Sequence, residues 1–152
     1  MTDGREGGRA AARVKAGPSL LYMVKRLELA VRSGLDEIVR PAGITAWQYT
    51  ALTVLERHDG LSTAQLARDS FVTAQSMADM VRTLEGRGFI ERRRNPANRR
   101  ELVIHLTGAG HELLAALAEP VRLLEARMLG DLTARQEEQF RRALARAWRA
   151  LS

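Results

Sequence analysis

Five arginines lie within nine residues of one another, around a short stretch of turn-forming residues. They are Arg92, Arg93, Arg94, Arg99 and Arg100. Guanidinium groups crowded in this way repel one another, so a polyanion that neutralises them is a natural partner. Arginine also inserts readily into the narrow minor groove of DNA. The segment therefore predicts contact with a nucleic-acid backbone or groove; the alternative interpretation is a solvated hairpin tip.

Strand geometry limits how many of these arginines can reach one ligand. Successive side chains of a strand point to opposite faces, which places Arg92 and Arg94 on one face and Arg93 on the other. We therefore expect one or two of the arginines to pair with Glu91 or Glu101 instead of with nucleic acid.

Short polar side chains occupy one face of the segment just before the arginines. Residues 73–87 predict an amphipathic helix. Its apolar face consists of Met77, Met80, Val81 and Leu84. On the opposite face Thr73, Gln75 and Ser76 carry groups that can read base edges, since glutamine pairs bidentately with adenine. A shorter helix over 63–68 precedes it, as in a helix-turn-helix whose second helix enters the major groove. The alternative is an ordinary amphipathic surface helix.

The remaining elements follow from apolar periodicity and from helix-capping residues. Capping boxes, in which Thr or Ser is followed three residues later by Gln, begin at Thr45, Ser62 and Thr133. Gly88 stands where a glycine would end the helix that precedes the arginines. We expect Pro120 to kink or break a helix. The predicted helices cover residues 18–40, 45–58, 62–68, 73–87, 107–129 and 133–151, and the predicted strands cover 89–93 and 101–106 around a turn at 95–98.

Composition narrows the classes of function. The chain has 152 residues, a net charge of +6 and no cysteine, which excludes disulfides, thiolate metal sites and cysteine nucleophiles. We see no Gly-rich phosphate loop, and His58, His105 and His111 are too scattered for a metal site. We therefore expect no enzyme activity and no metal or other cofactor. Apolar runs are too short to span a membrane, and residues 1–17 predict a disordered basic tail.

The segment 66–110 resembles the winged helix-turn-helix core of the MarR (multiple antibiotic resistance regulator) family. The resemblance is carried by residues 66–67, 73–84, 84–92, 98–100 and 103–110. The family's wing usually reads acidic residue, any residue, arginine, and then a strand that ends in Leu-Thr. Arg100 matches the arginine that the family places in the minor groove, whereas Asn98 stands where an acidic residue usually orients that arginine. An amide oxygen accepts a hydrogen bond too, but without charge assistance the bond is weaker.

The resemblance implies a mainly α fold with a small β-hairpin. It divides the chain into a winged helix-turn-helix domain at 45–106 and a helical dimerisation region at 18–44 and 107–152. The apolar stripes at 20–38 and 140–151 favour a homodimer, because neither has a partner within a small winged domain. Such a dimer presents two recognition helices about one DNA turn, roughly 10 bp, apart and binds a pseudo-palindrome. The residues expected to contact DNA are Ser62, Thr73, Gln75, Ser76, Arg82, Arg94, Asn98, Arg99 and Arg100.

Many members of this family bind small aromatic acids between the dimer helices and the winged domain. We expect Tyr22, Arg26, Trp47 and Tyr49 to line such a cleft, although Trp47 and Tyr49 also fit the core and Arg26 fits a surface salt bridge. The resemblance thus implies a cytoplasmic, nucleoid-associated repressor that a small aromatic or phenolic effector releases from DNA. The alternatives are a regulator or architectural DNA binder without an effector, and a winged helix used for protein contacts alone.

Overall fold

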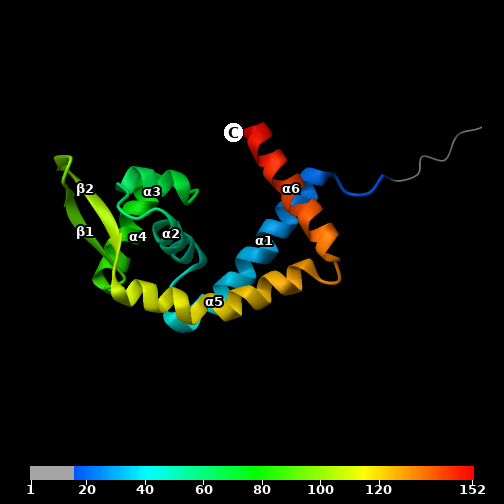
Figure 1. Ribbon diagram of the computed structural model, residues 1–152, viewed down its shortest axis with the longest axis horizontal. Coiled ribbons are helices and arrows are strands. Elements are labelled where there is room, and N and C mark those ends of the chain that lie inside the picture. The colour runs from blue at the N-terminus through cyan, green and yellow to red at the C-terminus, as the bar shows by residue number, and fades with distance from the viewer. Residues whose placement is uncertain (1–15) are drawn as a thin grey trace, which may run out of the picture.

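The computed structural model describes residues 16–152, so the predicted basic tail lies outside the described residues except for its last two. In chain order the elements are α1 (Leu20–Val39), η1 (Arg40–Ala42), α2 (Ala46–Arg57), α3 (Thr63–Asp69), α4 (Ala74–Gly86), β1 (Ile90–Asn95), β2 (Asn98–Leu106), α5 (Gly108–Leu129) and α6 (Ala134–Leu151). The predicted class, mainly α with one β-hairpin, is confirmed. In Figure 1, α2 to β2 gather at one end, α1 and α6 lie toward the other, and α5 runs along both.

Several helices begin at the capping residues that the sequence indicates. Thr45, Ser62 and Thr133 each form a complete capping box with the glutamine three residues later. These bonds satisfy backbone donors that the first turn of a helix otherwise leaves free. After α4, Gly88 adopts a φ of +80°, which confirms it as the glycine that ends this helix.

Of the kink or break expected at Pro120, the break does not occur, because α5 continues through the proline from Gly108 to Leu129. Proline removes one backbone donor, but burial of the preceding turns and the packing of the following turns against α1 offset that loss. Leu114 and Leu117 are buried just before it. Just beyond it, a Cβ on Gly34 of α1 would come within 2.7 Å of the Leu124 side chain, so the two helices cross closely there.

The hairpin is longer than predicted, and we call residues 90–106 the wing. Strand pairing extends from Ile90 opposite Leu106 to Asn95 opposite Asn98, with an irregularity between Arg94 and Asn95. The predicted strands stop earlier because turn-forming residues weaken the strand pattern near the tip. The backbone hydrogen bonding between the two strands nevertheless continues from the apolar base of the wing to its polar tip.

One hydrophobic core lies around α4. It includes Leu52 of α2, Leu66 of α3, Met77 of α4 and Ile104 of β2, all fully buried. By contrast, α6 contributes no buried side chain. Large apolar side chains are instead exposed on α1 and α6, namely Leu20, Leu21, Tyr22, Met23, Val24, Leu29, Leu144, Trp148 and Leu151. Within residues 16–152, no helix is long and apolar enough to cross a bilayer.

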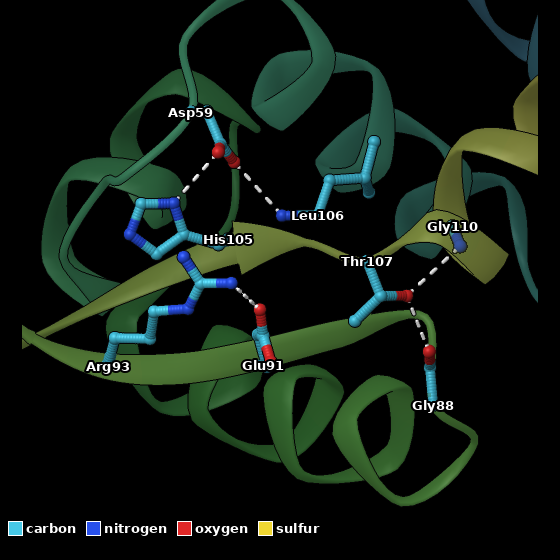
Figure 2. Close-up of polar contacts among 8 residues, drawn as sticks. All are labelled: Asp59, Gly88, Glu91, Arg93, His105, Leu106, Thr107 and Gly110. Carbon is cyan, nitrogen blue, oxygen red and sulfur yellow. Dashed lines mark hydrogen bonds and ion pairs between the residues drawn. The ribbon is translucent and has the colours of Figure 1, made fainter.

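The first turn of α5 lies directly against the end of α4. The Thr107 backbone N–H donates to the Phe89 carbonyl at 3.1 Å. The Thr107 hydroxyl donates to the Gly88 carbonyl at 2.6 Å and accepts from the Gly110 N–H at 3.1 Å (Figure 2). A Cβ on Gly110 would overlap the Phe89 carbonyl oxygen and lie 2.8 Å from the side chain of Leu106. Only a glycine at position 110 allows this approach.

We predict that Gly110→Ala lowers the free energy of unfolding by about 2–3 kcal/mol, because the added methyl group displaces backbone atoms rather than a flexible side chain. Urea denaturation at fixed protein concentration measures the change. The matched control is Gly108→Ala in the same helical turn, where a Cβ meets nothing within 4 Å. The control should change stability by no more than about 1 kcal/mol. Equal effects of the two substitutions would contradict the proposed close approach.

Candidate DNA interface

The exposed face of α4 carries polar residues at its N-terminal end. Met77, Val81 and Leu84 are buried in the core, which turns Gln75 and Ser76 outward to solvent. A helix held by one apolar face and bearing amide and hydroxyl groups on the other is suited to insertion into a major groove. The structure therefore places both residues where the sequence predicts them, on the open side of the helix.

Two of the predicted DNA contacts act as helix caps. The Thr73 hydroxyl accepts from the Ser76 N–H at 3.1 Å and donates to the Ser76 hydroxyl at 3.0 Å. Ser62 caps α3 by accepting from the Gln65 N–H at 3.2 Å. The Thr73 hydroxyl thereby uses its one donor, whereas the Ser62 hydroxyl keeps its donor free for a further partner. Thr73 and Ser62 thus position their helices, and the exposed Gln75 is the better candidate for base reading.

Arg82, further along α4, pairs with Asp79 one turn earlier. Both side chains are about two-thirds exposed, at 65% and 66%. An ion pair this open to water contributes little to stability, so a phosphate group can compete for the arginine.

Asparagine side chains shape the tip of the wing. The Asn98 carbonyl oxygen accepts from the backbone N–H of Arg100 at 3.2 Å, and the Asn95 carbonyl oxygen accepts from the Ala97 N–H at 3.0 Å. The Asn95 amide donates to Glu101 at 3.0 Å. Asn98 therefore fixes the backbone at Arg100 and does not bind its guanidinium group. The neutral amide makes this bond without the charge assistance that a carboxylate would provide.

Acidic partners engage two of the five clustered arginines. Arg93 pairs with Glu91, as predicted (Figure 2). Arg92 makes two hydrogen bonds to Glu85 of α4, at 3.0 and 2.9 Å, and these bonds lower the pKa of the Glu85 carboxyl. Glu101, the other acidic residue considered, accepts from the Asn95 amide and not from an arginine. Arg92 instead ties the wing to α4, a contact that only the folded arrangement of hairpin and helix creates.

The other three arginines define the part of the wing open to a ligand. Arg94 donates to the backbone carbonyl of Arg99 at 2.8 Å and so braces the tip. The side chains of Arg99 and Arg100 are exposed. The wing thus presents positive charge at its tip, with its base neutralised by acidic residues.

Asp59, in the loop between α2 and α3, holds the base of the wing. One carboxylate oxygen lies 2.8 Å from Nδ1 of His105, and the other accepts from the Leu106 N–H at 2.9 Å (Figure 2). Burial tends to raise the pKa of Asp59, but the hydrogen bonds from His105 and from the Leu106 backbone outweigh it and hold the pKa below 3.8. The sequence indicates only a turn here, because the partners lie 46 and 47 residues away.

Backbone pairing strengthens the same attachment. The Gly60 N–H donates to the Ile104 carbonyl at 3.0 Å, and the Ile104 N–H donates to the Leu61 carbonyl at 2.7 Å. This isolated bridge extends the hairpin by one further pairing. The loop before α3 is therefore joined to the wing by backbone hydrogen bonds as well as by Asp59.

A cavity of about 470 Å³ lies between α1 and the start of α2. It is lined by Val24, Leu27, Glu28, Val31, Arg32, Leu35, Ala46, Trp47, Thr50 and Phe71. The Arg32 guanidinium carbon lies 4.5 Å from the centroid of the Trp47 ring, and Arg32 also pairs with Glu28. The cavity is thus mostly apolar, with one cation stacked on an aromatic ring.

The predicted cleft residues are largely not in this cavity. Trp47 lines it, but Tyr22 and Arg26 lie together elsewhere on α1, and the half-buried Tyr49 packs against the core. Helical geometry explains the difference, since residues two apart, such as Trp47 and Tyr49, point to opposite sides. Arg32, six residues after Arg26, provides the cation instead.

Comparison with known proteins identifies the family. The family model described as the MarR family matches residues 44–102. The HTH-type transcriptional repressor Rv2887 of Mycobacterium tuberculosis is 34% identical over 123 residues, which cover 81% of this chain and 88% of the relative. The chain belongs to the MarR family of transcriptional regulators. The resemblance inferred from its wing and recognition helix is confirmed.

Solved structures of Rv2887 share the fold of this MarR-family chain. The crystal structure of Rv2887 in complex with DNA has a TM-score of 0.71 and 31% identity, covering 86% of this chain and 98% of that one. The complex of Rv2887 with salicylic acid has a TM-score of 0.71 and 33% identity, covering 86% of this chain and 97% of that one.

In the described part of this MarR-family chain, no three His, Asp or Glu side chains gather as a metal site requires.

We predict that Asp59→Asn lowers the free energy of unfolding by about 1 kcal/mol near neutral pH, because an uncharged amide cannot accept from both His105 and Leu106. The folded-state pKa of Asp59 lies below its ordinary value of 3.8. Its contribution is therefore present above that value and is lost as pH falls through the folded-state pKa. Urea denaturation across this pH range measures the difference from wild type. The control is Asp131→Asn in the exposed loop after α5; a difference that grew toward acid pH would refute the assignment.

Proposed function

We propose that this chain is a sequence-specific DNA-binding repressor that acts as a homodimer on a pseudo-palindromic site in the nucleoid, with no metal or organic cofactor and no catalytic step. The observation that carries the proposal is the pairing of an outward polar end of α4 with an arginine-bearing wing tip. Both belong to the same end of the molecule (Figure 1). Similarity to a repressor solved with DNA supports the same function.

The two DNA-contacting elements have separate tasks. Gln75 and Ser76 enter the major groove and read base edges. Arg99 and Arg100 follow the backbone or the minor groove, where positive charge contributes affinity on any sequence. Arg82 leaves its open ion pair for a phosphate group, and Asn98 acts indirectly by setting the backbone of the tip.

A second copy of the chain covers the exposed apolar faces of α1 and α6. Leu20, Leu21 and Leu151 are at least 80% exposed, and Trp148 is 69% exposed. Side chains of this size in one region of a chain are typical of a surface that associates. A two-fold arrangement places the two copies of α4 about one DNA turn apart.

A small aromatic carboxylate occupies the cavity and weakens DNA binding. The apolar lining receives the ring, Trp47 stacks on it, and Arg32 exchanges Glu28 for the ligand's carboxylate. Such an exchange keeps the arginine paired, so its charge is never left uncompensated in a mostly apolar space. The complex of the relative Rv2887 with salicylic acid supports this ligand class.

We predict that Arg100→Ala weakens binding about tenfold on every DNA sequence, because the lost contact is to the backbone or groove and not to a base edge. The slope of log affinity against log salt should fall by about 1. Fluorescence anisotropy with duplexes selected from a random library measures both quantities. The control is Arg146→Ala, an exposed arginine on α6, which should leave the slope unchanged. An unaltered slope for Arg100→Ala would exclude this arginine from the interface.

We predict that Gln75→Ala changes sequence preference more than total affinity, because glutamine contributes discrimination at an adenine. Selection from the same library should show a loss of about tenfold in preference at one position of each half-site. Gln139→Ala, an exposed glutamine of α6, serves as the control. If Gln75→Ala lowers affinity equally on selected and random DNA, the residue does not read a base.

A further inference from the structure

Phe71, in the turn between α3 and α4, combines two unfavourable features. Its φ is +62°, the only positive value among non-glycine residues in the described part of the chain. Left-handed backbone is uncommon for a bulky side chain and is usually occupied by glycine. Its ring is also 75% exposed to water. Neither the left-handed backbone nor the exposed ring stabilises the fold. The presence of a phenylalanine at this position therefore indicates a role other than stability.

The backbone of the turn explains the left-handed conformation. The Phe71 N–H donates to the Arg68 carbonyl at 3.3 Å, and the Val72 N–H donates to the Ala67 carbonyl at 3.1 Å. This pair of bonds closes a helix C-terminus in the Schellman arrangement, with Phe71 in the position where glycine is usual. The turn ends α3 and allows Thr73 to cap α4 two residues later. Glycine would satisfy the turn equally well, so the turn does not require the ring.

The ring of Phe71 lines the same cavity as Arg32 and Trp47. Every other lining residue belongs to α1 or to the first half of α2. Phe71 is therefore the point at which the helix-turn-helix reaches the cavity. An occupant that touches this ring touches the residue that leads into the cap of the recognition helix.

The two ends of α4 are held differently. At the C-terminal end, Arg87 donates to the carbonyls of Ala42 and Gly43, at 2.7 Å for the former. At the N-terminal end, α4 follows directly from the turn that carries Phe71. A displacement of the turn that carries Phe71 would therefore move the N-terminal end of α4 more than its C-terminal end.

We propose that Phe71 is the positioning residue through which an aromatic carboxylate in the cavity controls the recognition helix. The inference rests on the proposed function, since it assumes that α4 reads DNA and that the cavity binds the effector. The occupant packs against the ring of Phe71 and moves the turn, and the N-terminal end of α4 leaves its register with the major groove. Without the ring, the cavity binds its ligand more weakly, through Arg32 and Trp47, and DNA affinity no longer responds even when the cavity is saturated.

Full-length Phe71→Gly tests the proposal, because glycine keeps the left-handed turn and removes only the ring. DNA affinity is measured by anisotropy with and without saturating salicylate, and salicylate binding is measured by calorimetry. Wild type should lose about tenfold in DNA affinity when salicylate binds. Phe71→Gly should bind salicylate more weakly than wild type, because a lining ring is lost, so the comparison is made at salicylate concentrations that calorimetry shows to saturate the variant. Under those conditions Phe71→Gly should lose less than about twofold in DNA affinity. Phe71→Tyr, which restores an aromatic ring, should respond as wild type does.

Four outcomes would overturn the proposal in distinguishable ways. If Phe71→Gly responds to salicylate as wild type does, coupling does not pass through this ring. If folded Phe71→Gly binds DNA poorly without salicylate, the ring supports DNA docking itself. If wild type binds DNA but does not respond to salicylate, the effector part of the proposed function is wrong and the role of Phe71 falls with it. Absence of DNA binding by wild type would instead refute the regulator function as a whole.

Discussion

The contact between the start of α5 and the end of α4 is the constraint on which the geometry of the reading surface depends. Gly110 lets the helix approach the Phe89 carbonyl, and the Thr107 hydroxyl links the Gly88 carbonyl to the first turn of α5. The end of α4, the base of the wing and the start of α5 are therefore in direct contact with one another. Asp59 adds the loop before α3 to this junction through His105 and Leu106. The positions of α4, the wing and α5 relative to one another are thus set by short contacts to the backbone. Such contacts allow less variation in geometry than contacts between flexible side chains do.

Features that depend on neighbouring residues could be predicted from the sequence. Each capping box joins residues three apart, and Gly88 ends α4 through its own backbone freedom. The apolar spacing of α4 likewise indicated which of its faces is buried. The wing was predictable because turn residues separate two branched-residue strands, and the pattern around Arg100 identified the family. In all these cases the energetic preference lies within a few residues of chain.

Features that depend on tertiary packing could not be predicted. Arg92 pairs with Glu85 only because the wing folds back beside α4. Arg32, and not Arg26, reaches the cavity because the crossing of α1 with its neighbours selects one side of that helix. Pro120 is a local signal for a helix break, yet α5 stays continuous because Leu114 and Leu117 are buried before it and Leu124 packs against α1 after it. Phe71 gives no sequence signal at all, since a phenylalanine seldom occupies a left-handed position.

Because α5 is one continuous helix, a movement at one of its ends is transmitted to the other. Its 22 residues span roughly 33 Å at about 1.5 Å per residue, from the wing to the exposed apolar region. A rotation of about 10° at the far end of such a rod would move the wing by about 6 Å, which is close to the width of a B-DNA minor groove. In the proposed dimer, a small change in how the two copies meet would therefore be enough to carry a wing arginine from inside the groove to outside it. A break at Pro120 would have dissipated that motion in the helix itself.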